Sequence, residues 1–76
     1  MTDDSELKIN ARGLSAPGPR LMVRTALAKS QSGTVRVVVS TMEAAEDVKS
    51  FLEEQGATAI IDAVGEEYHV KAQLKA

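Results

Sequence analysis

Four segments of the chain have the apolar and polar pattern of β-strands. Apolar and polar side chains alternate in residues 6–11 and 67–75, and this period of two predicts half-buried strands. Residues 34–39 and 57–64 are rich in β-branched side chains, which predicts two further strands. Because residues 34–39 are apolar at nearly every position, we expect that strand to lie in the interior of the sheet.

The first of two predicted helices covers residues 19–32, where apolar side chains recur every three or four residues. Its predicted buried stripe is Pro19, Met22, Val23, Ala26, Leu27 and Ser30. Proline is tolerated in the first turn of a helix, so Pro17 and Pro19 place the helix start at residues 15–17. Gly33 is predicted to end the helix in a left-handed conformation.

The second predicted helix begins at a Ser/Thr-x-x-Glu capping box made by Ser40 and Glu43. Its predicted buried side is Ala44, Val48, Phe51, Leu52 and Gln55. Gly56 is predicted to end it, and Gly65 with Glu66 is predicted to form the two-residue turn of a final hairpin.

The resulting order, β-α-β-α-β-β, predicts an α/β two-layer sandwich. Crossovers between strands of one sheet are right-handed, which places both helices on one face of a four-stranded mixed sheet. We expect the first three strands to run parallel and the last to run antiparallel through its hairpin. We also expect residues 1–5 to be disordered and residues 6–76 to form a single domain.

The composition excludes several kinds of functional site. The chain has 76 residues and no cysteine, so it offers no disulfide, no thiolate nucleophile and no sulfur-ligated metal site. With His69 as its one histidine, we expect neither a metal nor a cofactor. A net charge of -2 and the absence of tryptophan argue against direct nucleic-acid contact. An acidic start and no apolar stretch of membrane-spanning length predict a cytoplasmic protein without a membrane partner.

The segment between the first strand and the first helix carries the candidate chemistry. Residues 10–20 contain both prolines of the chain and predict a strand end, a tight glycine-containing turn and a helix start. The free N–H groups of a helix start favour a bound anion or an ionised side chain. Here these groups are predicted to point back at Ala16, whose methyl group cannot ionise.

This segment resembles the Gly-Leu-x-Cys-Pro-x-Pro signature of the TusA/SirA/YedF family of small sulfur-carrier proteins. The residues that match the signature are Gly13, Leu14, Pro17, Gly18 and Pro19. The chain length and the order of elements are also similar to the family, so the resemblance covers nearly the whole chain. Ala16 stands where the family has its cysteine.

The resemblance implies a sulfur relay. In that family the cysteine takes sulfur as a persulfide from a cysteine desulfurase or rhodanese-like donor, and passes it to an acceptor protein for tRNA thiolation or cofactor synthesis. A helix N-terminus lowers the pKa of such a thiol, but Ala16 has none, so the chain is predicted to be inactive as a sulfurtransferase. Two explanations stay open: an engineered replacement of the cysteine, or a natural family member that has lost the chemistry.

Three arginines flank the helix start and are candidates for docking a partner protein. They are Arg12, Arg20 and Arg24, although arginine is also common as a solvated surface residue. The alternative to a sulfur carrier is a non-catalytic protein-interaction or regulatory module on the same fold. The partners that the resemblance implies are sulfur-donor and sulfur-acceptor proteins, and the chain is expected to be a monomer.

Overall fold

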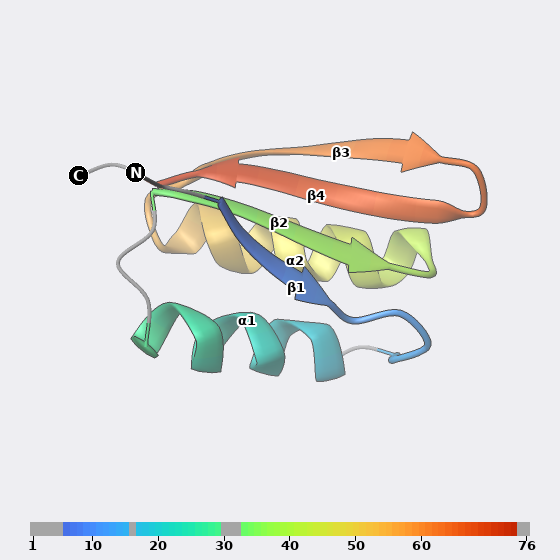
Figure 1. The fold of residues 1–76 in the computed structure, drawn as a ribbon, viewed down its shortest axis with the longest axis horizontal. Coiled ribbons are helices and arrows are strands. Elements are labelled where there is room, and N and C mark those ends of the chain that lie inside the picture. Colours follow the sequence, from blue (N-terminus) through green and yellow to red (C-terminus); the bar gives the residue numbers. More distant parts are fainter. Residues whose placement is uncertain (1–5, 16, 30–32, 75–76) are drawn as a thin grey trace.

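The computed structural model describes residues 6–15, 17–29 and 33–74, which form two layers (Figure 1). The elements follow in the order β1 (Glu6–Asn10), α1 (Gly18–Lys29), β2 (Thr34–Val39), α2 (Met42–Glu54), β3 (Thr58–Val64) and β4 (Glu67–Gln73). This order confirms the prediction, and both helices pack on the same face of the sheet (Figure 1). The predicted disorder of residues 1–5, and the predictions for Ala16 and Ser30, lie outside the described residues.

Within this described part, the sheet has the strand order β1-β2-β4-β3. β1 pairs in parallel with β2, and β4 pairs antiparallel with both β2 and β3. The first three strands therefore run in one direction and β4 in the other, as predicted. β4 lies between β2 and β3, and the Gly65–Glu66 turn, with Gly65 at φ 61°, reverses the chain between them.

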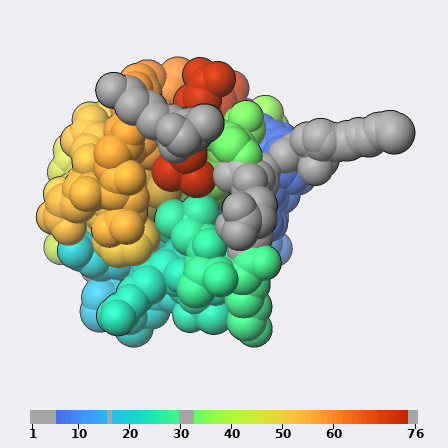
Figure 2. All heavy atoms as spheres, turned by 90° about the vertical axis from the view of Figure 1, so that its left-hand side faces the viewer, coloured from blue at the N-terminus to red at the C-terminus, as the bar shows by residue number. Residues whose placement is uncertain are grey.

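The core between sheet and helices is aliphatic. The inward side chains of β2, Val35, Val37 and Val39, are fully buried, as are Val48 and Leu52 of α2. Among the described residues no polar or charged residue is buried, so the alternation of apolar and polar positions decides which face of each strand enters the core. Figure 2 shows one end of the molecule, where α2 (gold) packs beside α1 (teal).

Three predictions about α1 need correction or adjustment. The helix begins at Gly18, one residue later than predicted, although the Pro17 carbonyl already accepts from the Leu21 N–H (3.1 Å). Met22 is 38% exposed instead of buried, and the side of α1 that packs on the core is Pro19 and Val23, which are buried, with Ala26 and Leu27, which are partly buried. Gly33 does not end the helix in a left-handed conformation, since its φ is not positive.

Both ends of α2 are closed by hydrogen bonds. The N-cap is Thr41 and not Ser40, since the Thr41 hydroxyl accepts from the Ala44 N–H (3.1 Å). At the other end, Gly56 has φ 89° and its N–H donates to the Glu53 carbonyl (3.0 Å), which confirms Gly56 as the terminating residue. The buried side is Ala44, Ala45, Val48, Phe51 and Leu52, so Ala45 takes the place predicted for Gln55, which is exposed.

Candidate functional site

A tight turn follows β1 and begins the site. The Leu14 N–H donates to the Ala11 carbonyl (3.3 Å), which closes a four-residue turn with Arg12 and Gly13 at its centre. Gly13 has φ 80°, the value that a type II turn requires at its third residue and that favours glycine. The predicted glycine-containing turn is therefore confirmed, and it needs Gly13 for a reason of backbone geometry.

Two hydrogen bonds attach this turn to the end of β2. The Ala11 N–H donates to the Val38 carbonyl (2.8 Å), which extends the pairing of β1 with β2 by one residue. The Gly13 N–H donates to the Ser40 hydroxyl (2.9 Å). Ser40 therefore supports the turn, although its sequence context predicted a helix cap.

A side-chain ion pair ties the turn to the start of β4. Arg12 donates from Nε and Nη2 to the two carboxylate oxygens of Glu67, and the second of these bonds is 3.1 Å long. His69 Nε2 lies 3.3 Å from Glu67 Oε1. The hydrogen bond from Arg12 is the main reason why the pKa of Glu67 lies below its usual range, and the hydrogen bond with His69 is the next. The same hydrogen bond with Glu67 raises the pKa of Arg12.

The helix start is packed tightly on the turn. The Gly18 N–H donates to the Ser15 carbonyl (2.8 Å), and Pro19 is buried. A Cβ at Gly18 would lie 3.3 Å from Leu14 Cβ, so a larger residue between the two prolines would require the Leu14 side chain to shift by a few tenths of an ångström. α1 carries no acidic residue in its first turn, and the positive end of its dipole is therefore not offset from within the helix.

The three candidate docking arginines have different environments. Arg12 is engaged by Glu67, as described above. Arg20 bridges to α2, with Nη1 3.2 Å from Asp47 Oδ1 and Nη2 3.2 Å from Glu54 Oε1, and its guanidinium lies 5.2 Å from the centre of the Phe51 ring. Arg24 is exposed and forms no ion pair with any described residue, so it is the arginine of the three whose charge is free for a partner.

Exposed apolar side chains border the helix start. Leu14, Leu21 and Met22 are 41%, 52% and 38% exposed, respectively. Leu21 and Met22 also line a shallow hollow of about 420 Å³ along α1, together with Thr25, Ala26 and Lys29. Neighbouring exposed apolar side chains of this kind are typical of a protein-interaction surface.

Across the described parts of the chain, no group of three or more histidine, cysteine, aspartate or glutamate residues is placed to hold a metal ion. No helix in those parts is long and apolar enough to cross a membrane.

Comparison with known proteins assigns the family. The family model for sulfurtransferase TusA matches residues 7–73. The chain belongs to the TusA family. Members of the TusA family are sulfur carriers that act with partner proteins, and the TusA match spans every described element of this chain except the first residue of β1.

A solved structure has the same fold. It is a SirA-like protein from Desulfitobacterium hafniense, similar over 92% of this chain and 99% of its own, with a TM-score of 0.79 and 19% sequence identity. The search of curated proteins gave no match.

The sequence motif indicates most of the residues of the candidate site but not those that support them. The turn, the prolines and the glycine between them were all visible as a motif. Ser40, Glu67, Asp47 and Glu54 were missed, because each reaches the site from a distant part of the chain. Leu21 could have been found, since it is apolar and yet lies off the predicted buried stripe of α1.

Proposed function

We propose that this chain has the scaffold of a sulfur-relay protein in which position 16 is the sulfur-carrying position, and that Ala16 prevents this form from carrying sulfur. In a chain with cysteine there, the thiolate attacks the outer sulfur of the donor's persulfide. The bond between the two donor sulfurs breaks, the donor leaves as a thiolate, and the carrier holds the new persulfide for an acceptor protein. We expect this relay in the cytoplasm, in tRNA thiolation or cofactor synthesis.

The observation that carries the proposal is the anchored turn before the helix start. Three contacts fix it: Ala11 to Val38, Gly13 to Ser40, and Arg12 to Glu67. A site that is held in place before its partner arrives needs less ordering during the transfer. In the sequence, position 16 follows this anchored turn and directly precedes Pro17. It therefore comes just before the N-terminus of α1, the end of the helix dipole that favours a thiolate.

Docking of donor and acceptor is proposed to use the surface beside position 16. Leu14, Leu21 and Met22 supply the apolar contacts, and Arg24 supplies a free positive charge for an acidic partner. Arg12 and Arg20 contribute less directly, because their guanidinium groups are already paired within the chain. Their main role in docking is to hold the turn and α1 in position.

Sulfur loading of the Ala16→Cys variant tests the proposal. The variant and the present chain are each incubated with a cysteine desulfurase, pyridoxal phosphate and cysteine, and intact masses are measured before and after reduction. We expect a reducible gain of one or more sulfur atoms on Ala16→Cys and none on the present chain. Ser15→Cys is the matched control, since its thiol lies one residue before the proposed position, and it should load more slowly.

Inorganic polysulfide, which needs no docking, separates two kinds of failure. If Ala16→Cys accepts sulfur from polysulfide but not from the desulfurase, the carrying position stands and that donor is not a partner. If Ser15→Cys and Ala16→Cys load equally with both sources, position 16 has no special role and the proposal is wrong.

A non-catalytic interaction module is the second candidate function. The exposed side chains of Leu14, Leu21 and Met22 favour it, because they offer an apolar contact surface that needs no thiol at position 16. This candidate predicts that an excess of the present chain slows loading of Ala16→Cys by competing for the donor. It also predicts that Leu21→Ser in the competing chain removes the inhibition, whereas Lys49→Gln, on α2, leaves it unchanged.

A further inference from the structure

The face of the sheet opposite the helices carries a row of positive charge. Lys8 of β1 lies beside Arg36 of β2, and Arg36 lies opposite Lys71 of β4. Neighbouring strands are about 4.8 Å apart, so three like charges meet side by side in one row. Such an arrangement destabilises a sheet unless negative charge offsets it.

Acidic side chains of the chain neutralise only part of this positive charge. Glu6 Oε2 lies 3.4 Å from Arg36 Nε, and Asp62 Oδ2 lies 3.4 Å from Lys71 Nζ. Arg36 Nε is shielded from solvent, yet it donates no hydrogen bond to any group of the described residues, so its pairing with Glu6 is poor. Lys8 is exposed and forms no ion pair with any described residue. The row therefore has positive charge left for an external anion.

A hollow of about 260 Å³ lies at this row and collects further polar groups. It is lined by Lys8, Ile9, Asn10, Arg12, Arg36, Val38 and His69. This volume is below that of clefts for drug-sized ligands, and it suits a single small anionic group. Lysine and arginine side chains that converge on one hollow are the usual ligands of phosphate oxygens.

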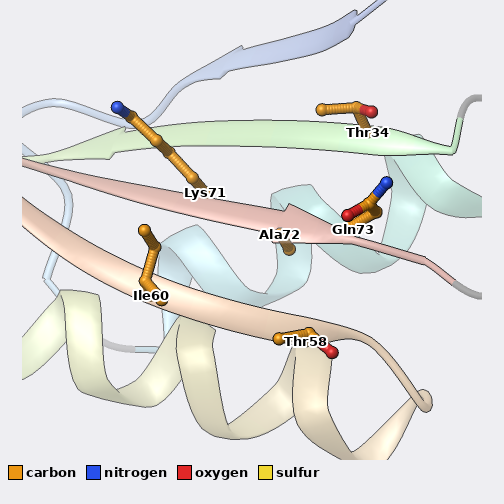
Figure 3. A pocket seen from close by; sticks show the side chains of 6 residues that line it. All are labelled: Thr34, Thr58, Ile60, Lys71, Ala72 and Gln73. Atoms are coloured by element: carbon orange, nitrogen blue, oxygen red, sulfur yellow. The ribbon is translucent and has the colours of Figure 1, made fainter.

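A second hollow on the same side of the sheet extends the polar surface. It has about 340 Å³ and is lined by Thr34, Thr58, Ile60, Lys71, Ala72 and Gln73. Figure 3 shows Lys71 and Ile60 rising from neighbouring strands on the side away from the helices. Ile60 is 57% exposed and ends the charged row on this side, because it lies opposite Lys71.

We propose that the hollow beside Lys8 and Arg36 binds the phosphate group of a small molecule. Acidic side chains lie around it, with Glu6 two residues before Lys8, Glu67 two residues before His69, and Asp62 opposite His69. These carboxylates contact Arg36, Arg12 and Lys71 and so offset most of the positive charge besides that of Lys8, which favours one phosphate group over the extended charge of a nucleic-acid backbone. The proposal does not depend on sulfur transfer at position 16.

Two-dimensional ¹H–¹⁵N NMR with inorganic phosphate, at constant ionic strength against chloride, tests the proposal. We expect saturable shifts of the amides around Lys8, Arg36 and His69. The double variant Lys8→Gln, Arg36→Gln should bind phosphate at least about tenfold more weakly, because charge-assisted hydrogen bonds dominate such a site. Arg24→Gln, which removes an exposed arginine from the helical layer, should bind as the unchanged chain does.

Lys8→Gln alone breaks no ion pair between described residues, so it keeps the test valid if the double variant fails to fold. It should weaken phosphate binding about threefold. Shifts that chloride reproduces, or that Arg24→Gln reduces as much as Lys8→Gln does, would overturn the proposal. So would binding of a single-stranded oligouridylate without binding of phosphate, since that result identifies a polynucleotide surface.

Discussion

Glu67 is the residue that connects the anchored turn with the open face of the sheet. It accepts from Arg12, which holds the turn, and it lies within 3.3 Å of His69, which lines the proposed phosphate hollow. The two hydrogen bonds favour the carboxylate, so the pKa of Glu67 is lower in the folded chain than the ordinary value of about 4.3. One of the three contacts that attach the turn therefore depends on the charge of Glu67.

Removing this charge should change how stability responds to acid. A lowered folded pKa means that the stabilisation is present above the unfolded pKa and is lost as the pH falls through the folded pKa. We expect Glu67→Gln to be less stable than the unchanged chain at pH 7, with the difference shrinking below about pH 4. Urea unfolding across this pH range measures it.

Glu66→Gln is the matched control for Glu67→Gln. Glu66 is exposed in the hairpin turn and forms no ion pair with any described residue. Its substitution should leave the pH dependence of unfolding unchanged. If Glu67→Gln and Glu66→Gln give the same curve, the pair with Arg12 does not hold the turn.

Among the elements, α2 shows how one polar residue caps a helix while its neighbour supports the site. Thr41 caps α2 through the Ala44 N–H, and Ser40 accepts from Gly13 in the turn. Thr41→Ala should therefore lower the free energy of unfolding by about 1 kcal/mol, the usual effect of losing an N-cap. Urea unfolding followed by far-UV circular dichroism measures this loss.

Ser40→Ala should act on the turn instead of the helix. We expect faster hydrogen exchange at the Gly13 amide in Ser40→Ala and no change there in Thr41→Ala. If Ser40→Ala instead speeds hydrogen exchange in the first turn of α2, Ser40 is the cap that the sequence predicted.

Arg20 connects the two helices. It pairs with Asp47 and Glu54 of α2 and lies over the Phe51 ring. Because the arginine is about one third exposed, solvent screens these pairs, and we expect Arg20→Ala to cost only about 1 kcal/mol in unfolding free energy. Arg24→Ala, without such partners, should change it by less than about 0.3 kcal/mol. If both substitutions lower the unfolding free energy equally, the contacts of Arg20 with α2 do not stabilise the packing of the two helices.

For the whole molecule, local patterns predicted the elements well and long-range contacts poorly. The alternation around Ile9 and Val70 and the β-branched run of β2 identified the strands and their buried faces. The position of β4 between β2 and β3 was not predicted, since strand order depends on pairing between distant segments. Met22 was placed wrongly because the helical stripe that faces this small sheet is narrower than the apolar pattern.

In the candidate site too, local features were predicted and long-range contacts were not. Gly13, Pro17 and Pro19 were predicted, because glycine suits a left-handed turn position and proline suits a helix start, and both requirements can be read locally. Their supports from Ser40 and Glu67 were not, since hydrogen bonds between residues far apart in sequence leave no local pattern.

The central claim is that the start of α1 is built to hold a sulfur anion at position 16. The most direct measurement is the thiol pKa of Ala16→Cys, from thiolate absorbance against pH, with Ser15→Cys and urea-unfolded Ala16→Cys as references. We expect a value at least about one unit below the ordinary cysteine value of about 8.5, and below that of Ser15→Cys. A pKa at or above that of Ser15→Cys would contradict the claim, because the helix start would then give position 16 no advantage for sulfur chemistry.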